Sequence, residues 1–122
     1  MRADSISLQE LYTNPQNQTR SEALIIYNSD NPCENCTKAR KMLSALLKQH
    51  YSDNLTIYHI NLAFHPEFAP AFEIHAPLTL VIIRISDGAA FGYEKLAGIQ
   101  SLADNTSIFT HRITEFIENF LN

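Results

Sequence analysis

The two cysteines of the chain, Cys33 and Cys36, are two residues apart in the stretch SDNPCENCTKARKML. Thiols at this spacing can bind a metal ion, form a structural disulfide, or exchange a disulfide with another molecule. Exchange needs one exposed thiolate that attacks and a second thiol that resolves the mixed disulfide. The pair lies where a strand-like run gives way to a helical pattern, so the surrounding sequence helps to choose among these chemistries.

Composition narrows the class of protein and of partner. With 122 residues, 45% of them hydrophobic and 18% charged, we expect one globular domain over residues 1–122, in which 1–20 form an N-terminal helix and connector. The net charge of −4 argues against binding to nucleic acid or an anionic membrane. The chain has no apolar run long enough for a membrane span and no apolar N-terminal signal, so we expect a cytoplasmic protein. In that compartment a close cysteine pair is more often catalytic or metal-binding than structural.

Hydrophobic patterns predict alternating strands and helices. Ser7 and Glu10 form a capping box that begins a short helix from about Leu8 to Tyr12, and Ile6 and Leu11 are spaced for a hydrophobic staple. Further helices are predicted at 34–50, near Pro66 and from about Asn105, and strands at 23–27, 55–62, 78–85 and 89–97. Asp87-Gly88 is a hairpin turn signal between the last two strands. The order β-α-β-α-β-β-α predicts an α/β fold with a mixed sheet and helices on both faces.

A Cys-x-x-Cys pair beside a βαβ pattern is typical of redox proteins with a thioredoxin-like fold. A second stretch, APAFEIHAPLTLVII, resembles the segment that precedes the third core strand in the thioredoxin superfamily, although one loop is a residue shorter. The matching positions are Ala69-Pro70, Phe72, Ile74 and Pro77, within a resemblance that runs from about Ala23 to Gly98. The resemblance implies a thioredoxin-like fold, thiol–disulfide exchange with protein substrates, no cofactor, and a monomer or weak dimer.

The same resemblance implies that the Ala76–Pro77 bond is cis and lies against the cysteine pair. The backbone of Ala76 would then contact substrate, and His75, two residues before Pro77, would face the cysteines. The alternatives are an ordinary trans proline that starts a strand and a solvated loop histidine.

The two cysteines are expected to have different roles. Cys33 is predicted at a helix N-terminus, where unpaired N–H groups stabilise a thiolate, so it would attack. Cys36 shares a helical stripe with Ala39 and Leu43, so it would be buried and would resolve. Asn35 and Glu34, which lie between the two cysteines, are expected to tune the redox reactivity of the pair. The Glu34 carboxylate opposes the Cys33 thiolate by only ~1 kcal/mol in water.

The chain departs from the family in several ways. Thioredoxins carry Trp before the first cysteine and Gly-Pro between the two, whereas this chain has Pro32 and no Trp. The buried acid of thioredoxins, six residues before the attacking cysteine, is replaced by Tyr27, so we expect slow resolution. A Tyr at the end of the first strand is also a feature of glutaredoxins. However, the Gly-Gly-Cys-Asp-like stretch with which glutaredoxins bind glutathione is not evident in this chain. We therefore place the chain outside both main types.

Zinc is the main metal alternative, but a structural zinc site needs four Cys or His ligands in paired spacing. The chain has two cysteines, and no two of its histidines lie three to five residues apart in one element: His50, His59, His65, His75 and His111. We expect no metal. The alternative function is a non-catalytic thioredoxin-fold module that binds a partner or senses oxidants through the same cysteine pair.

Overall fold

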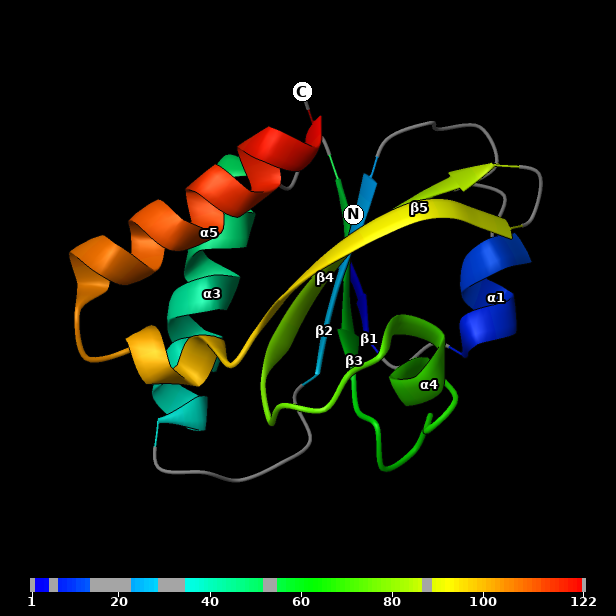
Figure 1. Ribbon diagram of the computed structural model, residues 1–122, viewed down its shortest axis with the longest axis horizontal. Coiled ribbons are helices and arrows are strands. Elements are labelled where there is room, and N and C mark those ends of the chain that lie inside the picture. The colour runs from blue at the N-terminus through cyan, green and yellow to red at the C-terminus, as the bar shows by residue number, and fades with distance from the viewer. Residues whose placement is uncertain are drawn as a thin grey trace.

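The computed structural model describes residues 2–4, 7–13, 23–28, 35–51, 55–86 and 89–121. In this part of the chain, a five-stranded sheet lies between two layers of helices (Figure 1). The strands are β1 (Arg2–Asp4), β2 (Ala23–Asn28), β3 (Thr56–Ile60), β4 (Thr79–Ser86) and β5 (Ala89–Ala97). Their order is β1-β3-β2-β4-β5, with β1 and β2 parallel to β3 and with β4 antiparallel to both β2 and β5. The predicted mixed α/β fold is confirmed.

The helical elements cover both faces of this sheet. They are α1 (Leu8–Thr13), α3 (Cys36–His50), α4 (Phe68–Phe72), the 3-10 helix η1 (Ile99–Leu102) and α5 (Thr106–Leu121). Figure 1 shows α3, α5 and η1 on one face and α1 and α4 on the other. No described helix is long and apolar enough to cross a membrane.

Two elements were not predicted from the sequence. Strand β1 has the residues Arg-Ala-Asp, which carry no apolar pattern, and it forms because its backbone pairs with the edge of β3. Helix η1 follows Gly98, whose φ of 69° is a conformation that favours glycine. The predicted hairpin turn Asp87-Gly88 lies outside the described residues, although Ser86 and Ala89 on either side of it are paired.

The core consists of two hydrophobic clusters, one on each face of the sheet. Strand β4 contributes to both, with Leu80 and Ile82 toward α3 and α5, and Val81 and Ile83 toward α1 and α4. Because β4 lies between β2 and β5 and is covered on both faces, its sequence is a continuous apolar run rather than an alternating one.

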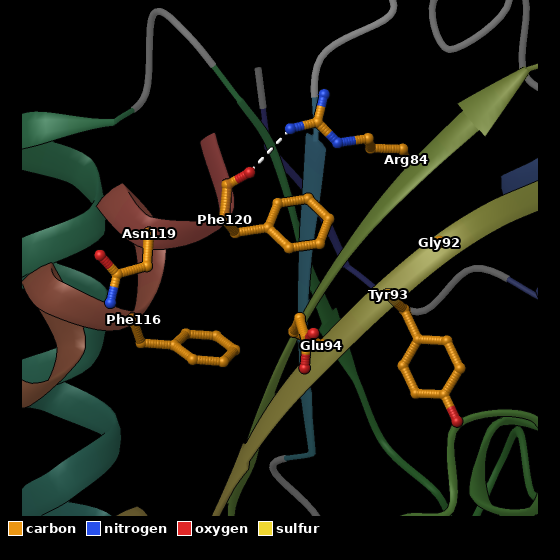
Figure 2. Close-up of a pocket in the computed structure, with 7 residues that line it drawn as sticks. All are labelled: Arg84, Gly92, Tyr93, Glu94, Phe116, Asn119 and Phe120. Carbon is orange, nitrogen blue, oxygen red and sulfur yellow. Dashed lines mark hydrogen bonds between the residues drawn. The ribbon is translucent and has the colours of Figure 1, made fainter. Parts of the chain in front are cut away.

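At each end of helix α5, a side chain forms a hydrogen bond with a backbone group. At its start, the Asn105 Oδ1 accepts a hydrogen bond of 3.1 Å from the Ile108 N–H. At its end, the guanidinium of Arg84 on β4 donates a hydrogen bond of 2.7 Å to the Phe120 carbonyl (Figure 2). The same guanidinium carbon lies 4.9 Å from the centre of the Phe120 ring, a cation–π contact. These contacts join the last turn of the helix to the sheet.

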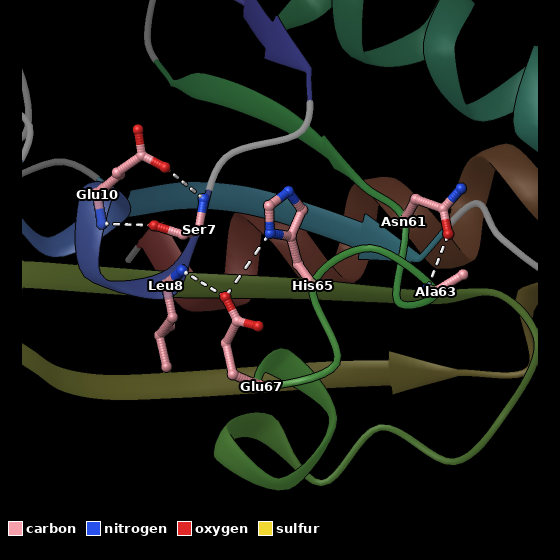
Figure 3. A network of polar contacts seen from close by, with 7 residues as sticks. All are labelled: Ser7, Leu8, Glu10, Asn61, Ala63, His65 and Glu67. Atoms are coloured by element: carbon pink, nitrogen blue, oxygen red, sulfur yellow. Dashed lines mark hydrogen bonds and ion pairs between the residues drawn. The ribbon is translucent and has the colours of Figure 1, made fainter.

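The predicted capping box at the start of α1 is confirmed. The Ser7 Oγ accepts a hydrogen bond of 3.2 Å from the Glu10 N–H, and Glu10 Oε1 accepts one of 3.1 Å from the Ser7 N–H (Figure 3). For the predicted staple, Leu11 is fully buried, whereas Ile6 lies outside the described residues.

A tertiary contact also supports the first turn of α1. Glu67, which precedes α4, accepts a hydrogen bond of 3.2 Å from the Leu8 N–H through Oε2. The same oxygen lies 3.8 Å from Nδ1 of His65 (Figure 3). The segment between β3 and α4 is thereby joined to α1.

Candidate redox site

The cysteine pair belongs to the connection between β2 and α3. Cys33 and Glu34 lie outside the described residues, so their roles stay predictions. Helix α3 begins at Cys36, with Asn35 as its N-cap residue, which is two residues later than predicted. Helix boundaries depend on local turn geometry and are the least predictable part of a helix.

Cys36 lies in the core, as its predicted place on the helical stripe requires. Its exposed fraction is 0%, as are those of Ala39 and Leu43. It is not a free thiol. It belongs to the hydrophobic cluster on this face of the sheet, which also includes Leu78, the residue before β4, and Ile99 of η1. Such burial suits a resolving cysteine, which a bulky reagent or a protein substrate cannot reach directly.

Asn35 begins α3 without capping it through its side chain. The residue is half-buried, with φ −106° and ψ 3°, and makes no side-chain cap hydrogen bond. Its carbonyl accepts a hydrogen bond of 2.9 Å from the Ala39 N–H. The side chain at the N-cap therefore satisfies none of the first-turn N–H groups, which can stabilise negative charge nearby.

Tyr27, predicted in place of the family's buried acid, lies near the end of β2. Its backbone is in register with His59 of β3 and Leu80 of β4, so it lies in an interior strand of the sheet. Its effect on the cysteines stays a prediction.

The predicted cis bond at Ala76–Pro77 is wrong. Among the described residues, which include both of these, no peptide bond is cis. A trans bond is the more stable form before proline by about 0.5–1 kcal/mol, and nothing in the local sequence requires its reversal. The role of Ala76 as a substrate contact depended on the cis bond and loses that support.

The segment that contains this bond nevertheless leads into the hydrophobic cluster to which Cys36 also belongs. Ala76 and Pro77 are half-buried and His75 is exposed, as a solvated loop histidine would be. Leu78 is fully buried in the same cluster as Cys36, and its carbonyl accepts hydrogen bonds from the N–H groups of Gly98 and Ile99 at 3.0 and 3.3 Å. Contact of His75 or Pro77 with the cysteines stays a prediction.

One residue near this segment was missed by the sequence analysis. Glu73 adopts a left-handed conformation, with φ 53° and ψ 49°, where α4 ends. A sequence signal for it is absent, because that conformation is typical of Gly or Asn rather than Glu.

Other features of the described residues lie away from this site. No three His, Cys, Asp or Glu side chains among them are grouped so that they could hold a metal ion. A groove of about 580 Å³ lies between the last turns of α5 and strands β4 and β5. Figure 1 places that end of α5 opposite the start of α3. The groove is lined by Arg84, Gly92, Tyr93, Glu94, Phe116, Asn119 and Phe120 (Figure 2).

Comparison with known proteins gives a match of structure rather than of sequence. No family model matches the chain, and no curated protein matches it in sequence. Thioredoxin from Fasciola hepatica superposes with a TM-score of 0.67 and 18% identity over 98% of each chain. Thioredoxin from Trichomonas vaginalis gives 0.67 and 13% identity over 98% of this chain and 96% of that one.

A mitochondrial protein gives the same result. Oxidised mitochondrial thioredoxin 3 from Saccharomyces cerevisiae superposes with a TM-score of 0.62 and 19% identity over 93% of each chain. These structures match almost the whole chain at sequence identities that are informative about the fold alone. The chain has the fold of the thioredoxin superfamily.

Proposed function

We propose that the protein is a cytoplasmic thiol–disulfide oxidoreductase that acts on protein thiols or disulfides through Cys33 and Cys36. The observation that carries this proposal is the position of Cys36. It is the first residue of α3, it is fully buried, and it is not a free thiol. The one other cysteine of the chain is Cys33, three residues earlier, which supports a redox couple between the two.

In the proposed reaction, the Cys33 thiolate attacks a disulfide of the substrate. A mixed disulfide forms, and one substrate sulfur leaves as a thiolate and takes up a proton. Cys36 then loses its proton and attacks the sulfur of Cys33, which releases the second substrate thiol. The substrate gains two electrons and two protons, and the Cys33–Cys36 pair becomes a disulfide. A dithiol reductant returns the pair to the reduced state by the same steps in reverse order.

The start of α3 supports the first step. Cys33 is two residues before the N-cap Asn35, and the side chain of Asn35 makes no cap hydrogen bond. The positive end of the helix dipole and its N–H groups favour a thiolate over a thiol in that position. We therefore propose a pKa for Cys33 below that of a free cysteine.

The second candidate function is a non-catalytic module that binds a partner or senses oxidants through the same pair. The trans bond at Ala76–Pro77 favours this candidate, because the thioredoxin resemblance had implied a cis bond beside the cysteines. The lack of an acid at Tyr27 favours it as well, since Cys36 would lose its proton slowly.

Single cysteine variants test the proposed function. With dithiothreitol as the reductant, we expect Cys33→Ser to abolish the acceleration of insulin reduction by the protein over dithiothreitol alone, because the remaining thiol is buried. We expect Cys36→Ser to keep the attack but lose resolution, so that a mixed disulfide with insulin accumulates and is seen by non-reducing electrophoresis and mass spectrometry. Equal alkylation of both thiols by iodoacetamide, with no mixed disulfide, would instead support the non-catalytic module.

A further inference from the structure

The groove beside the last turns of α5 has a glycine in its floor. Gly92 lies in the interior of β5, in register with Arg84 of β4 (Figure 2). Glycine in a strand interior costs stability, because it has no side chain to pack and loses much conformational freedom on folding. It often marks a place where the backbone is distorted or where a ligand approaches closely.

The fold itself does not require glycine at this position. A Cβ built on Gly92 would meet no atom within 4 Å beyond its chain neighbours, so no neighbouring group needs the space. Its φ lies outside the left-handed region, in contrast to that of Gly98. The register shift between Arg84 and Ile85 marks a β-bulge, but the bulge that depends on glycine has that glycine at positive φ. The missing side chain instead leaves the groove open above the strand.

Two opposite charges line the groove without pairing to each other. The Arg84 guanidinium donates one hydrogen bond, of 2.7 Å, to the Phe120 carbonyl and makes no other with a described residue. Arginine has five N–H donors in a planar arrangement that suits a carboxylate, so donors remain for a ligand. Glu94 is exposed and forms no ion pair within the described part of the chain.

Aromatic rings form the apolar part of the groove. Phe116 and Phe120 are both half-buried and pack against the core on this face of the sheet. In the view of Figure 2, the Phe120 ring lies between the Arg84 guanidinium and the Glu94 carboxylate. The volume of about 580 Å³ is in the range of small-molecule sites, which combine apolar surface with a few charged groups. A complementary ligand has an anion and a cation with an apolar body between them.

We propose that this groove binds a short apolar peptide of two or three residues with free termini. The peptide carboxylate binds Arg84, its ammonium group binds Glu94, and its side chains lie against the two phenylalanine rings. Glu94 is two residues along β5 from Gly92, the register partner of Arg84, a separation of about 7 Å. A single amino acid has both charged groups on one carbon atom, whereas each added residue separates them by about 3.3–3.6 Å more.

Isothermal titration calorimetry with four ligands tests the proposal on the unmodified protein. The probe is leucyl-phenylalanine, for which we expect saturable binding with a Kd below about 1 mM. Its C-terminal amide should bind at least about tenfold more weakly, because Arg84 loses a charged partner. Its N-acetyl derivative should bind about twofold to fivefold more weakly, because an exposed ion pair with Glu94 contributes less. Free phenylalanine should bind at least about tenfold more weakly, because it does not span both charges.

A variant that fills the groove provides the second arm. Gly92→Val places a side chain in the open space and should weaken binding of leucyl-phenylalanine at least about tenfold, with no fall in Tm, because valine suits a strand. Gly92→Ala, with a smaller side chain, should weaken it less and replaces the valine variant if that one does not fold. The matched control is Ala97→Val, at an exposed position on the same strand and outside the groove, which should keep the wild-type Kd.

Three results would overturn the proposal. They are no saturable binding of leucyl-phenylalanine up to about 10 mM, equal affinity for the dipeptide and its amide, and a folded Gly92→Val that binds as tightly as the wild type. The inference does not depend on the proposed redox function. Because the titrations involve no thiol chemistry, each of these results would leave that function standing.

Discussion

Helices α3 and α5 cover the same face of the sheet but begin in different ways. The start of α5 is capped by the Asn105 side chain, and its end is joined to β4 by Arg84. The start of α3 has Asn35 at the N-cap without a side-chain cap hydrogen bond, whereas at its other end the C-cap residue Tyr51 donates its N–H to the Leu47 carbonyl.

This difference distinguishes helix ends whose side-chain contacts stabilise the fold from a helix start whose N–H groups can stabilise a thiolate. Capping side chains satisfy first-turn N–H groups and so stabilise a helix by about 1 kcal/mol. A start without such a cap forgoes that stabilisation, but its N–H groups remain able to interact with a nearby thiolate. The start of α3, which is Cys36 itself and lies three residues after Cys33 in the chain, is the helix start that the proposed redox function would use.

The largest effect of a substitution, on the free energy of unfolding, is expected where α5 meets the sheet. Arg84→Met should lower the free energy of unfolding by about 2 kcal/mol, because a charge-assisted hydrogen bond and a cation–π contact with Phe120 are both lost. Urea unfolding measures this change, and Arg112→Met, at an exposed position on the same helix, is the control. Equal destabilisation by both variants would mean that the contacts at Phe120 contribute nothing specific.

The next effect concerns the start of α3. Asn35→Asp introduces a carboxylate that can occupy the first-turn N–H groups and repel a thiolate. The rate at which iodoacetamide modifies Cys33 near neutral pH should fall by about tenfold, which corresponds to a pKa raised by about one unit. Asn35→Ala should leave that rate close to the wild-type value. If Asn35→Asp reacts as fast as the wild type, the helix start does not stabilise the Cys33 thiolate.

A smaller effect compares the two N-cap asparagines directly. Asn105→Ala should cost about 1 kcal/mol of unfolding free energy, because the Ile108 N–H loses its acceptor. Asn35→Ala should cost close to nothing, because its side chain makes no cap hydrogen bond. Chemical denaturation of both variants under one set of conditions gives the comparison, and equal costs would remove the distinction between the two helix starts.

Much of the fold followed from the sequence because its signals are local. The capping box at Ser7, the apolar run of β4, and the helical stripe through Cys36 each reflect burial or hydrogen bonding within a short segment. The elements that were missed depend on distant partners. Strand β1 pairs with the edge of β3, and Glu73 at the left-handed turn accepts hydrogen bonds from Tyr93 and Lys95 of β5.

The candidate site was only partly predictable for a related reason. The burial of Cys36 follows from helical spacing, and the structure agrees with it. The isomer of the Ala76–Pro77 bond depends on how the chain enters β4, and a motif resemblance to proteins with a longer loop there led to the wrong isomer. The uncapped state of Asn35 was not predictable either, because Asn is a favoured N-cap residue by type.

The smallest expected effect is a pH dependence at the capped start of α1. Hydrogen bonds from Ser7 lower the pKa of Glu10 from its ordinary value of 4.5, and backbone N–H groups of Glu67 itself and of Leu8 lower the pKa of Glu67. Because both pKa values are lower in the folded state, these carboxylates stabilise the fold above about pH 4.5, and their contribution is lost as the pH falls through the folded values.

The Tm difference between the wild type and the double variant Glu10→Gln/Glu67→Gln should therefore be present near about pH 6 and should shrink toward zero near about pH 3. Calorimetry across this range measures the difference. Glu94→Gln, at an exposed position on β5, is the matched control for loss of a negative charge. A difference that stays constant from acid to neutral pH would mean that the two carboxylates act through packing rather than through their charge. The Glu10 and Glu67 side chains would then stabilise the start of α1 through contacts that do not depend on their charge, and the contrast with the start of α3 would not be electrostatic.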